Sequence, residues 1–264
     1  MGRDRETVKR FLVNLRASWR VVFLILWTFG MFCLLMGLCF LARLRSVEAG
    51  LRVRAAIIRT WARIALRACG FRTIVQGSPP PAPCFTVSNH LSSIDSVVFC
   101  AIIGGTFVAR HDMEQWPLIG TLTRNVGIIF VNRLRRTDVT SINTRIAEAL
   151  EKGYAVHMYA ESRIGDGKAV LPFKPALLEP AVQTQMPVHY AVIGYRTFPG
   201  DAPPMEAIHW GPSKPFTEHI LDILRLRGAE VTVTFGDTSI SGTDRKELAQ
   251  ALWERVESEF VPLD

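Results

Sequence analysis

Hydrophobic and polar positions divide this chain into an apolar N-terminal part and a longer part in which short apolar runs alternate with amphipathic stretches. Residues 21–42 form one run of 22 residues without a charged side chain. At 1.5 Å per residue, a helix of that length crosses the hydrocarbon core of a bilayer. The core helix of a soluble protein is rarely this long without any polar face, and the apolar run of a cleaved signal peptide is shorter. We therefore expect a membrane-inserted helix over 21–42.

A second, amphipathic helix is expected at about 47–69. Its arginines recur at spacings of seven, four and four, and so share one face: Arg52, Arg59, Arg63 and Arg67. Such a face is typical of a helix lying on anionic lipid, although an ordinary solvated helix has the same pattern. Basic residues flank the apolar run on both sides, so the positive-inside rule does not orient it. We favour a monotopic hairpin over a complete crossing.

The proline-rich stretch 77–83, GSPPPAP, predicts a stiff linker between an N-terminal anchor (1–76) and a catalytic domain (84–264). Strands are expected at 84–88, 107–109, 127–132, 155–160, 187–194, about 205–210 and 231–235. Helices are expected at 93–103, 137–152, 175–184, 217–226 and 244–259. This alternation predicts an α/β fold with a mixed, largely parallel sheet flanked by helices.

The basic charge belongs to the N-terminal segment. Residues 1–72 contain 14 Lys and Arg against 3 Asp and Glu, whereas the remainder contains 17 against 21. This asymmetry indicates an anionic membrane surface as the partner of that end, and no basic, aromatic-rich stripe indicates nucleic acid. The five cysteines are odd in number and lack C-x2-C spacing, so we expect buried thiols, with neither a disulfide framework nor a metal site.

The stretch 88–95, SNHLSSID, carries the strongest candidate for chemistry. Positions five apart on a helix point about 140° away from each other, so His90 reaches Asp95 only from the turn before the helix. Ser92 or Ser93 is the expected N-cap, with Asp95 just inside the helix. A neutral imidazole held by a carboxylate can act as a general base toward an alcohol. A substrate hydroxyl could then attack without a serine or cysteine nucleophile.

By itself this spacing also fits a turn histidine capped by a nearby acid. Further stretches follow in order: FVARHDMEQWPLIG (107–120), GIIFVNR (127–133), YAESRIGDG with LPFK (159–174), and MPVHYAVIGY (186–195). Together with His-x4-Asp they resemble the four blocks of the glycerolipid acyltransferase family, of the lysophosphatidic-acid acyltransferase type. The resemblance covers about residues 80–240, and four ordered blocks are more specific than any one. It implies that family's fold and two-helix membrane anchor.

The resemblance assigns binding roles to several residues outside the first block. In the family, the arginine at Arg133 is thought to hold the polar head of the acyl acceptor, and a forked guanidinium suits that task. Gly127 would allow close backbone approach, and Arg110 keeps the positive charge of a family lysine. Lys174, in LPFK, could attract phosphate. The alternatives are a solvated Arg133, an exposed Lys174 and an ordinary strand-edge glycine.

In the third block, the family's Phe-Pro-Glu-Gly-Thr is replaced here by YAESR at 159–163. Glu161 is kept, and we expect it to orient the acceptor-binding arginine or a backbone turn, with a structural ion pair as the alternative. Losing the glycine and threonine removes any contact that they make in the family. Arg163 adds a cation, which a different or bulkier anionic head group would explain, as would drift in a tolerant loop.

The resemblance implies a membrane-associated O-acyltransferase in which His90 deprotonates a lysolipid hydroxyl and Asp95 holds the ring. The co-substrate would be acyl-CoA or acyl carrier protein, with no bound cofactor and no metal. We expect lysophosphatidic acid as the acceptor; a lyso-ornithine lipid is the alternative, because DGKAVLPFK and FGDTSISGTDRKELAQ resemble that bacterial branch. A non-catalytic lipid-binding relative is the alternative of another class, and an esterase lacks support without a G-x-S-x-G elbow. The resemblance places the chain at a bacterial inner membrane, with its catalytic domain on the cytoplasmic side.

Overall fold

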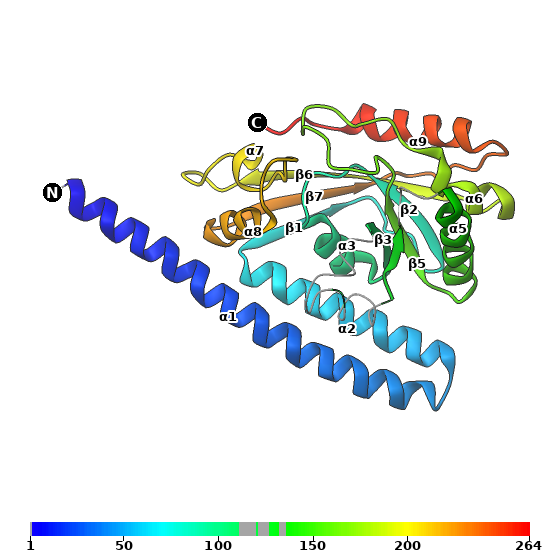
Figure 1. Ribbon diagram of the computed structural model, residues 1–264, viewed down its shortest axis with the longest axis horizontal. Helices are drawn as coiled ribbons and strands as arrows, with labels where there is room; N and C mark the ends of the chain where they lie inside the picture. The colour runs from blue at the N-terminus through cyan, green and yellow to red at the C-terminus, as the bar shows by residue number, and fades with distance from the viewer. Residues whose placement is uncertain (1, 111–119, 121–126, 132–135) are drawn as a thin grey trace.

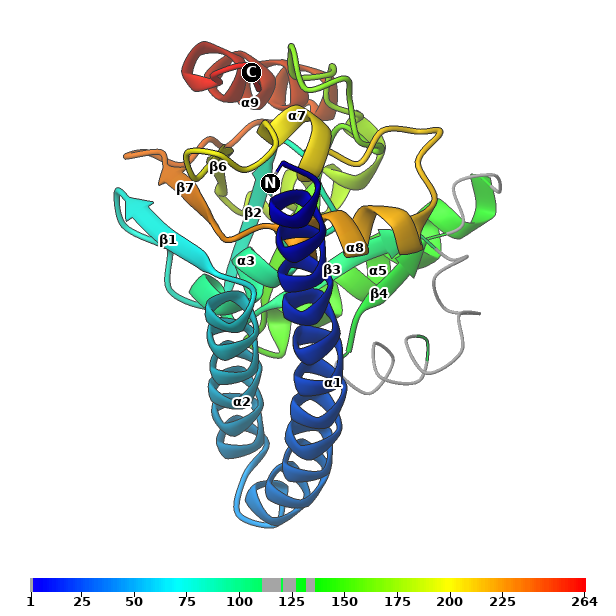
Figure 2. The ribbon, with the colours of Figure 1, turned by 90° about the vertical axis from the view of Figure 1, so that its left-hand side faces the viewer.

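The N-terminal part of the chain forms a long helical hairpin beside an α/β domain (Figure 1). The computed structural model describes residues 2–110, 120, 127–131 and 136–264. The hairpin consists of α1 (Gly2–Arg43) and α2 (Val47–Ala68), which run antiparallel (Figure 2). Its α2 is the helix expected at 47–69, whereas α1 extends the apolar run in both directions. By length and composition, Arg10–Arg43 of α1 is apolar enough to cross a membrane.

The arginine face of α2 contacts protein as well as solvent. Arg59 Nη2 donates to the carbonyl of Ile103, and Arg63 Nε donates to the carbonyl of Ala101, each at 3.0 Å. These carbonyls end the helix α3 (Asp95–Ile103), where the helix dipole leaves partial negative charge. These two arginines therefore bind the α/β domain, which differs from the lipid-facing role expected of them.

In the described part of the chain, seven strands form one sheet in the order β1-β7-β6-β2-β5-β3-β4. The strands are β1 (Phe71–Gln76), β2 (Cys84–Ser88), β3 (Thr106–Arg110), β4 (Ile129–Val131), β5 (Ala155–Tyr159), β6 (Val188–Thr197) and β7 (Ala229–Phe235). All neighbours are parallel except β6 and β7. The predicted mixed, largely parallel sheet is confirmed, and the central strand β2 is buried at every position.

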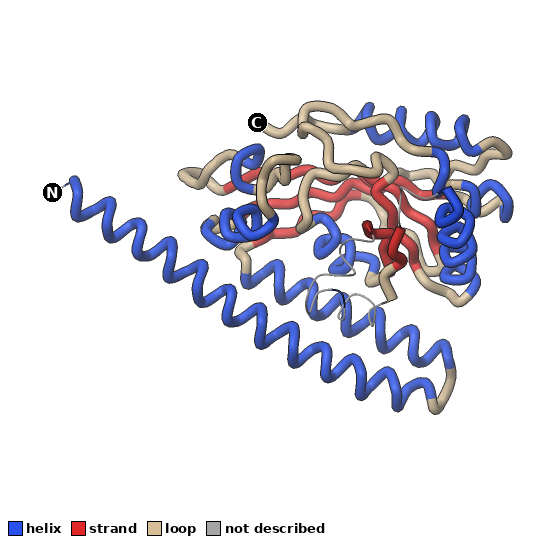
Figure 3. Tube along the Cα trace, viewed as in Figure 1, coloured by secondary structure: helices blue, strands red, loops and turns tan. Residues whose placement is uncertain are grey.

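Helices cover both faces of this sheet (Figure 3). One hydrophobic core lies between the sheet and the helices α2, α3 and α8 (Phe216–Arg225). The other lies under α5 (Arg136–Glu151), α6 (Glu179–Thr184) and α9 (Arg245–Glu259). The hairpin is thus packed on the first of these cores through α2, and is a structural part of the domain.

Two expected elements differ from the structure, and one strand of the structure was not expected. The prediction of a strand at about 205–210 is wrong, since the structure has the short helix α7 (Pro204–Ala207) at the start of this run. A short apolar run does not by itself distinguish a strand from a buried helical turn. The helix expected at 175–184 is a 3-10 turn, η2 (Pro175–Leu177), followed by α6. The strand β1 was not expected, and it pairs with β7 although it precedes the proline-rich stretch. The sheet therefore includes residues that we assigned to the anchor.

Candidate catalytic site

The carboxyl end of the central strand β2 leads directly into the candidate site. His90 lies in the turn between β2 and α3, and Asp95 is the first residue of α3. His90 Nδ1 lies 2.8 Å from Asp95 Oδ2. The His90 side chain is 17% exposed and that of Asp95 is fully buried, so the imidazole faces outward from a buried carboxylate. Sites in parallel sheets commonly lie at this carboxyl edge.

Asp95 receives three further hydrogen bonds. Its Oδ2 accepts from the backbone amides of Leu91, at 2.7 Å, and Ser92, at 2.9 Å. Its Oδ1 accepts from the hydroxyl of Tyr195, on β6, at 2.5 Å. These donors compensate for the desolvation of a buried carboxylate. The expected serine N-cap is wrong: Ile94 occupies that position without a side-chain cap, and the Asp95 carboxylate holds the amides of the turn instead.

The ring of His90 is fixed on a second side by Tyr159, the last residue of β5. The two rings stack with their centroids 3.8 Å apart and their planes at 9°. Because Nδ1 faces a carboxylate, it carries the proton of a neutral ring, which leaves the lone pair on Nε2. The arrangement thus presents one basic nitrogen in a defined orientation, which is the geometry that a general base requires.

Glu161 ties this turn to the loop that follows β5. Its Oε1 accepts from the His90 amide at 2.7 Å, and its Oε2 accepts from the Leu171 amide at 2.8 Å. Burial raises the pKa of Glu161 to about 8, against the opposing effect of these two amides. Of the roles considered for Glu161, these contacts match the orientation of a backbone turn.

Ser162 and Gly127 occupy backbone conformations that favour glycine. Ser162 stands where the family motif has glycine, and its φ of 69° shows that the chain keeps the left-handed conformation without the glycine. Gly127 has a φ of 82°, and a Cβ there would lie 3.0 Å from the guanidinium of Arg54, on α2. The close approach at Gly127 is therefore made by the protein's own hairpin.

The proposed binding residues are brought together only in part. Arg163 and Lys174 are both exposed on the loop after β5, and the Lys174 amide donates to the carbonyl of Ala160 at 2.8 Å. Arg110 ends β3, but its side chain lies outside what the structure describes. Arg133 lies outside the described residues.

Sequence reasoning missed several residues of this site. Besides Tyr195 and Tyr159, the side chain of Asn89 joins the end of β2 to β6, exchanging hydrogen bonds of 2.9 and 2.8 Å with the backbone of Ile193. His219, on α8, contacts the turn through Ser93. The position of Asn89 beside His90 was the one local signal; the others come from distant parts of the chain.

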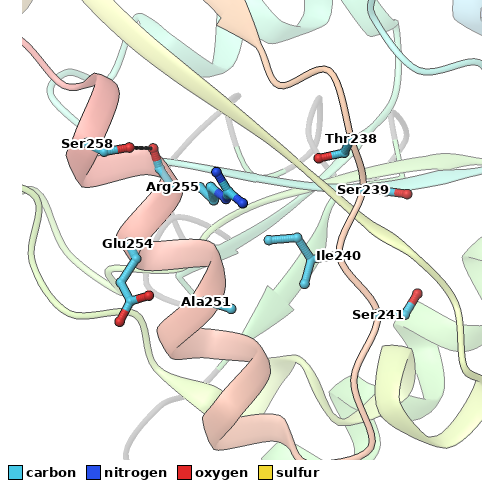
Figure 4. Close-up of a pocket in the computed structure, with 8 residues that line it drawn as sticks. All are labelled: Thr238, Ser239, Ile240, Ser241, Ala251, Glu254, Arg255 and Ser258. Carbon is cyan, nitrogen blue, oxygen red and sulfur yellow. Dashed lines mark hydrogen bonds between the residues drawn. The ribbon is translucent and has the colours of Figure 1, made fainter.

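Other features of the described residues lie apart from this site. A polar groove runs between the segment 238–241 and α9 (Figure 4), and none of its lining residues contributes to the His90–Asp95 pair. Among the residues that the structure describes, no group of three or more His, Cys, Asp or Glu is placed to hold a metal ion.

Comparison with known proteins gives three kinds of similarity. The sequence model of the family described as Acyltransferase matches residues 72–194. A lyso-ornithine lipid O-acyltransferase of Brucella abortus is 32% identical over 207 residues, which cover 74% of this chain and 78% of that protein. A 1-acyl-sn-glycerol-3-phosphate acyltransferase of Neisseria gonorrhoeae is 29% identical over 155 residues, 58% of this chain and 61% of that protein. The match to this relative thus spans less than two thirds of its length.

A solved structure has the same fold. The crystal structure of the 1-acyl-sn-glycerophosphate (LPA) acyltransferase PlsC from Thermotoga maritima superposes with a TM-score of 0.66. The superposition covers 95% of this chain and 97% of that one, at 18% sequence identity. At this identity the likeness concerns the arrangement of the elements.

Proposed function

This chain belongs to the acyltransferase family, and we propose that it transfers a fatty acyl group from a thioester donor to the free hydroxyl of a lysolipid. The observation that carries the proposal is the His90–Asp95 pair, because its 2.8 Å contact orients one basic nitrogen at the carboxyl edge of the sheet.

In the proposed reaction, His90 Nε2 takes the proton of the lysolipid hydroxyl as the oxygen attacks the thioester carbonyl. The tetrahedral intermediate then collapses, the carbon–sulfur bond breaks, and the imidazolium returns the proton to the leaving thiolate. Asp95 keeps the proton of the neutral ring on Nδ1 and stabilises the imidazolium between the two steps. The products are the diacyl lipid and the free thiol of the carrier.

The names of the relatives bear on which lysolipid accepts the acyl group. Three proteins named lyso-ornithine lipid O-acyltransferase, from Brucella abortus, Pseudomonas aeruginosa and Rhizobium meliloti, align with 74%, 86% and 78% of this chain. The Neisseria gonorrhoeae protein named for 1-acyl-sn-glycerol-3-phosphate aligns with 58%. The longer alignments support a lyso-ornithine lipid as the acceptor, and lysophosphatidic acid, which the motif blocks first suggested, is the second candidate.

Positive side chains are proposed to hold the anionic parts of the substrates. Arg163 and Lys174 are exposed on the loop after β5, and Glu161, two residues before Arg163, links the start of this loop to the amide of His90. Arg110 and Arg133 are assigned to the acceptor head group on the family motif alone. The donor is proposed to be the thioester of CoA or of acyl carrier protein.

The hairpin is proposed to hold the enzyme on the cytoplasmic face of the bacterial inner membrane. Large apolar side chains of α1 are exposed along most of its length, among them Phe11, Trp19, Leu26, Phe29 and Phe40. Their burial in lipid would provide a driving force of roughly 25 cal/mol for each Å² removed from water. An antiparallel pair of helices suits entry and exit by one leaflet.

Acyl transfer should be tested with membranes that contain the protein. Labelled acyl-CoA and acyl carrier protein would be offered with lyso-ornithine lipid and with lysophosphatidic acid, with His90→Ala as the paired variant. We expect product that falls by about 10²-fold or more in the variant, because general base catalysis is typically worth that much. Equal product from both proteins would exclude His90 as the base. No product from a wide panel of lysolipids would favour a lipid-binding protein without activity.

A further inference from the structure

The hydrogen bonds of the catalytic turn extend to a histidine outside the four sequence blocks. His219, on α8, is fully buried, and its Nε2 lies 2.9 Å from Ser93 Oγ and 3.3 Å from Ser92 Oγ. These serines are the middle of the segment between His90 and Asp95. We propose that His219 is a positioning residue for acyl transfer, which holds the turn that presents His90; this inference rests on the proposed function.

The His219 ring is itself held by a second residue that contacts the turn. Trp210 stacks on His219 with a centroid separation of 5.3 Å and an interplanar angle of 8°. The Trp210 amide donates to the carbonyl of Leu91 at 3.1 Å, and its indole N–H donates to the carbonyl of Lys214 at 2.9 Å. The segment 210–219 therefore reaches the catalytic turn through a backbone bond and through the His219 side chain.

The hydrogen bonding of His219 is directed at the turn alone. Burial, with a smaller contribution from Lys214, lowers the pKa of His219 to about 4, so the ring is neutral at ordinary pH. Its Nδ1 is buried without a hydrogen-bond partner among the described residues. An unmatched buried polar atom costs stability, and an apolar side chain would avoid that cost. What the histidine adds over an apolar residue is its contact with the two serines.

A displacement of Ser92 and Ser93 would change the position of His90 Nε2, the nitrogen proposed to take the proton. The Ser92 amide is one of the donors that hold Asp95 Oδ2, and Ser93 is two residues from Asp95. If the turn relaxes, the carboxylate and the His90 ring lose their common alignment. Misplacement of a catalytic group by about 1 Å can cost on the order of 10²-fold in rate, so small shifts here matter.

The test compares two substitutions of His219. His219→Phe keeps an aromatic ring against Trp210 and removes both serine contacts, whereas His219→Gln keeps a polar group near the position of Nε2. We expect His219→Phe to lower kcat about 10-fold with little change in the acceptor KM, and His219→Gln to recover most of the loss. Val256→Ala, in the core beneath α9, is the control for reduced stability, since Val256 is fully buried and far in the chain from the turn.

A double substitution shows whether His219 acts through the serine. If it does, Ser93→Ala combined with His219→Phe loses no more activity than His219→Phe alone. Additive losses would overturn the proposal, as would a His219→Gln variant no better than His219→Phe, or an equal loss in Val256→Ala at the same melting temperature. Should His219→Phe fail to fold, Ser93→Ala and His219→Gln still test the contact.

A readout independent of activity separates this inference from the proposed function. Modification of His90 by diethyl pyrocarbonate, followed by mass spectrometry, reports how firmly the turn is held. We expect faster modification in His219→Phe than in wild type and Val256→Ala. If the wild type transfers no acyl group, the proposed function fails but this comparison still applies, and equal modification rates would overturn the positioning role.

Discussion

Replacing Tyr195 with phenylalanine should slow acyl transfer while leaving the sheet intact. The Tyr195 hydroxyl donates to Asp95 Oδ1 at 2.5 Å, and both residues are buried. The ring of Tyr195 meets Phe71 edge-on, with centroids 6.3 Å apart, and a phenylalanine would keep that contact. The substitution therefore removes one donor from a buried carboxylate and no packing.

The size of the effect follows from the remaining contacts of Asp95. A hydrogen bond to a charged group contributes about 1.5–3 kcal/mol. Asp95 keeps the contacts with His90 and with the amides of Leu91 and Ser92, so the carboxylate stays in place but is held on one oxygen only. If the whole loss appears in the transition state, kcat/KM falls about 10-fold to 150-fold. Asp95→Asn sets the upper limit, about 10⁴-fold, because it removes control of the tautomer.

The assay is the initial rate of acyl transfer at saturating lysolipid, together with the melting temperature. We expect kcat to fall and the acceptor KM to stay unchanged, since Tyr195 acts on Asp95 and not on the lipid. Tyr190→Phe is the matched control, because Tyr190 lies on the same strand and packs in the opposite core. A Tyr195→Phe variant with unchanged kcat would refute the reasoning, as would an equal loss in Tyr190→Phe.

Two further predictions concern the loop after β5. Burial raises the pKa of Glu161 from 4.5 to about 8. Between these two values the folded protein keeps the proton of Glu161, whereas the unfolded chain has lost it. The free energy of unfolding should therefore fall as the pH rises from 4.5 to about 8. Melting temperatures between pH 5 and 9 should therefore fall less steeply for Glu161→Gln, and parallel curves would contradict this. Ser162→Gly should stabilise the fold by about 1 kcal/mol, because φ is 69° at this position and glycine adopts such a φ without strain. The control is Ala169→Gly, at a loop residue without a positive φ, which should destabilise the fold. Equal shifts of the melting temperature in the two variants would exclude backbone strain as the cause.

Several features of the protein were predictable because they depend on short-range patterns. Period-2 and period-3.6 runs determine where strands and helices begin, and they located α2, α5, α8 and α9 to within about one residue. The five-residue spacing of His90 and Asp95 required a turn before the helix, which the structure confirms. Short apolar runs carry less information, so a strand was expected at 205–210, where the structure has the end of the short helix α7 followed by a turn.

The tertiary structure alone decided what surrounds this pair. Tyr195 lies 100 residues along the chain from Asp95, and Glu161 lies 71 residues from His90. His219 lies 126 residues from Ser93. No local periodicity encodes such contacts, because they follow from which strands become neighbours and from how α8 packs on the sheet. The arginines of α2 are a second example. Their common helical face was evident in the sequence, but only the position of α3 showed that Arg59 binds the carboxyl end of α3. A short sequence pattern specifies an element and its faces, whereas the partner of each face depends on the packing of the whole chain.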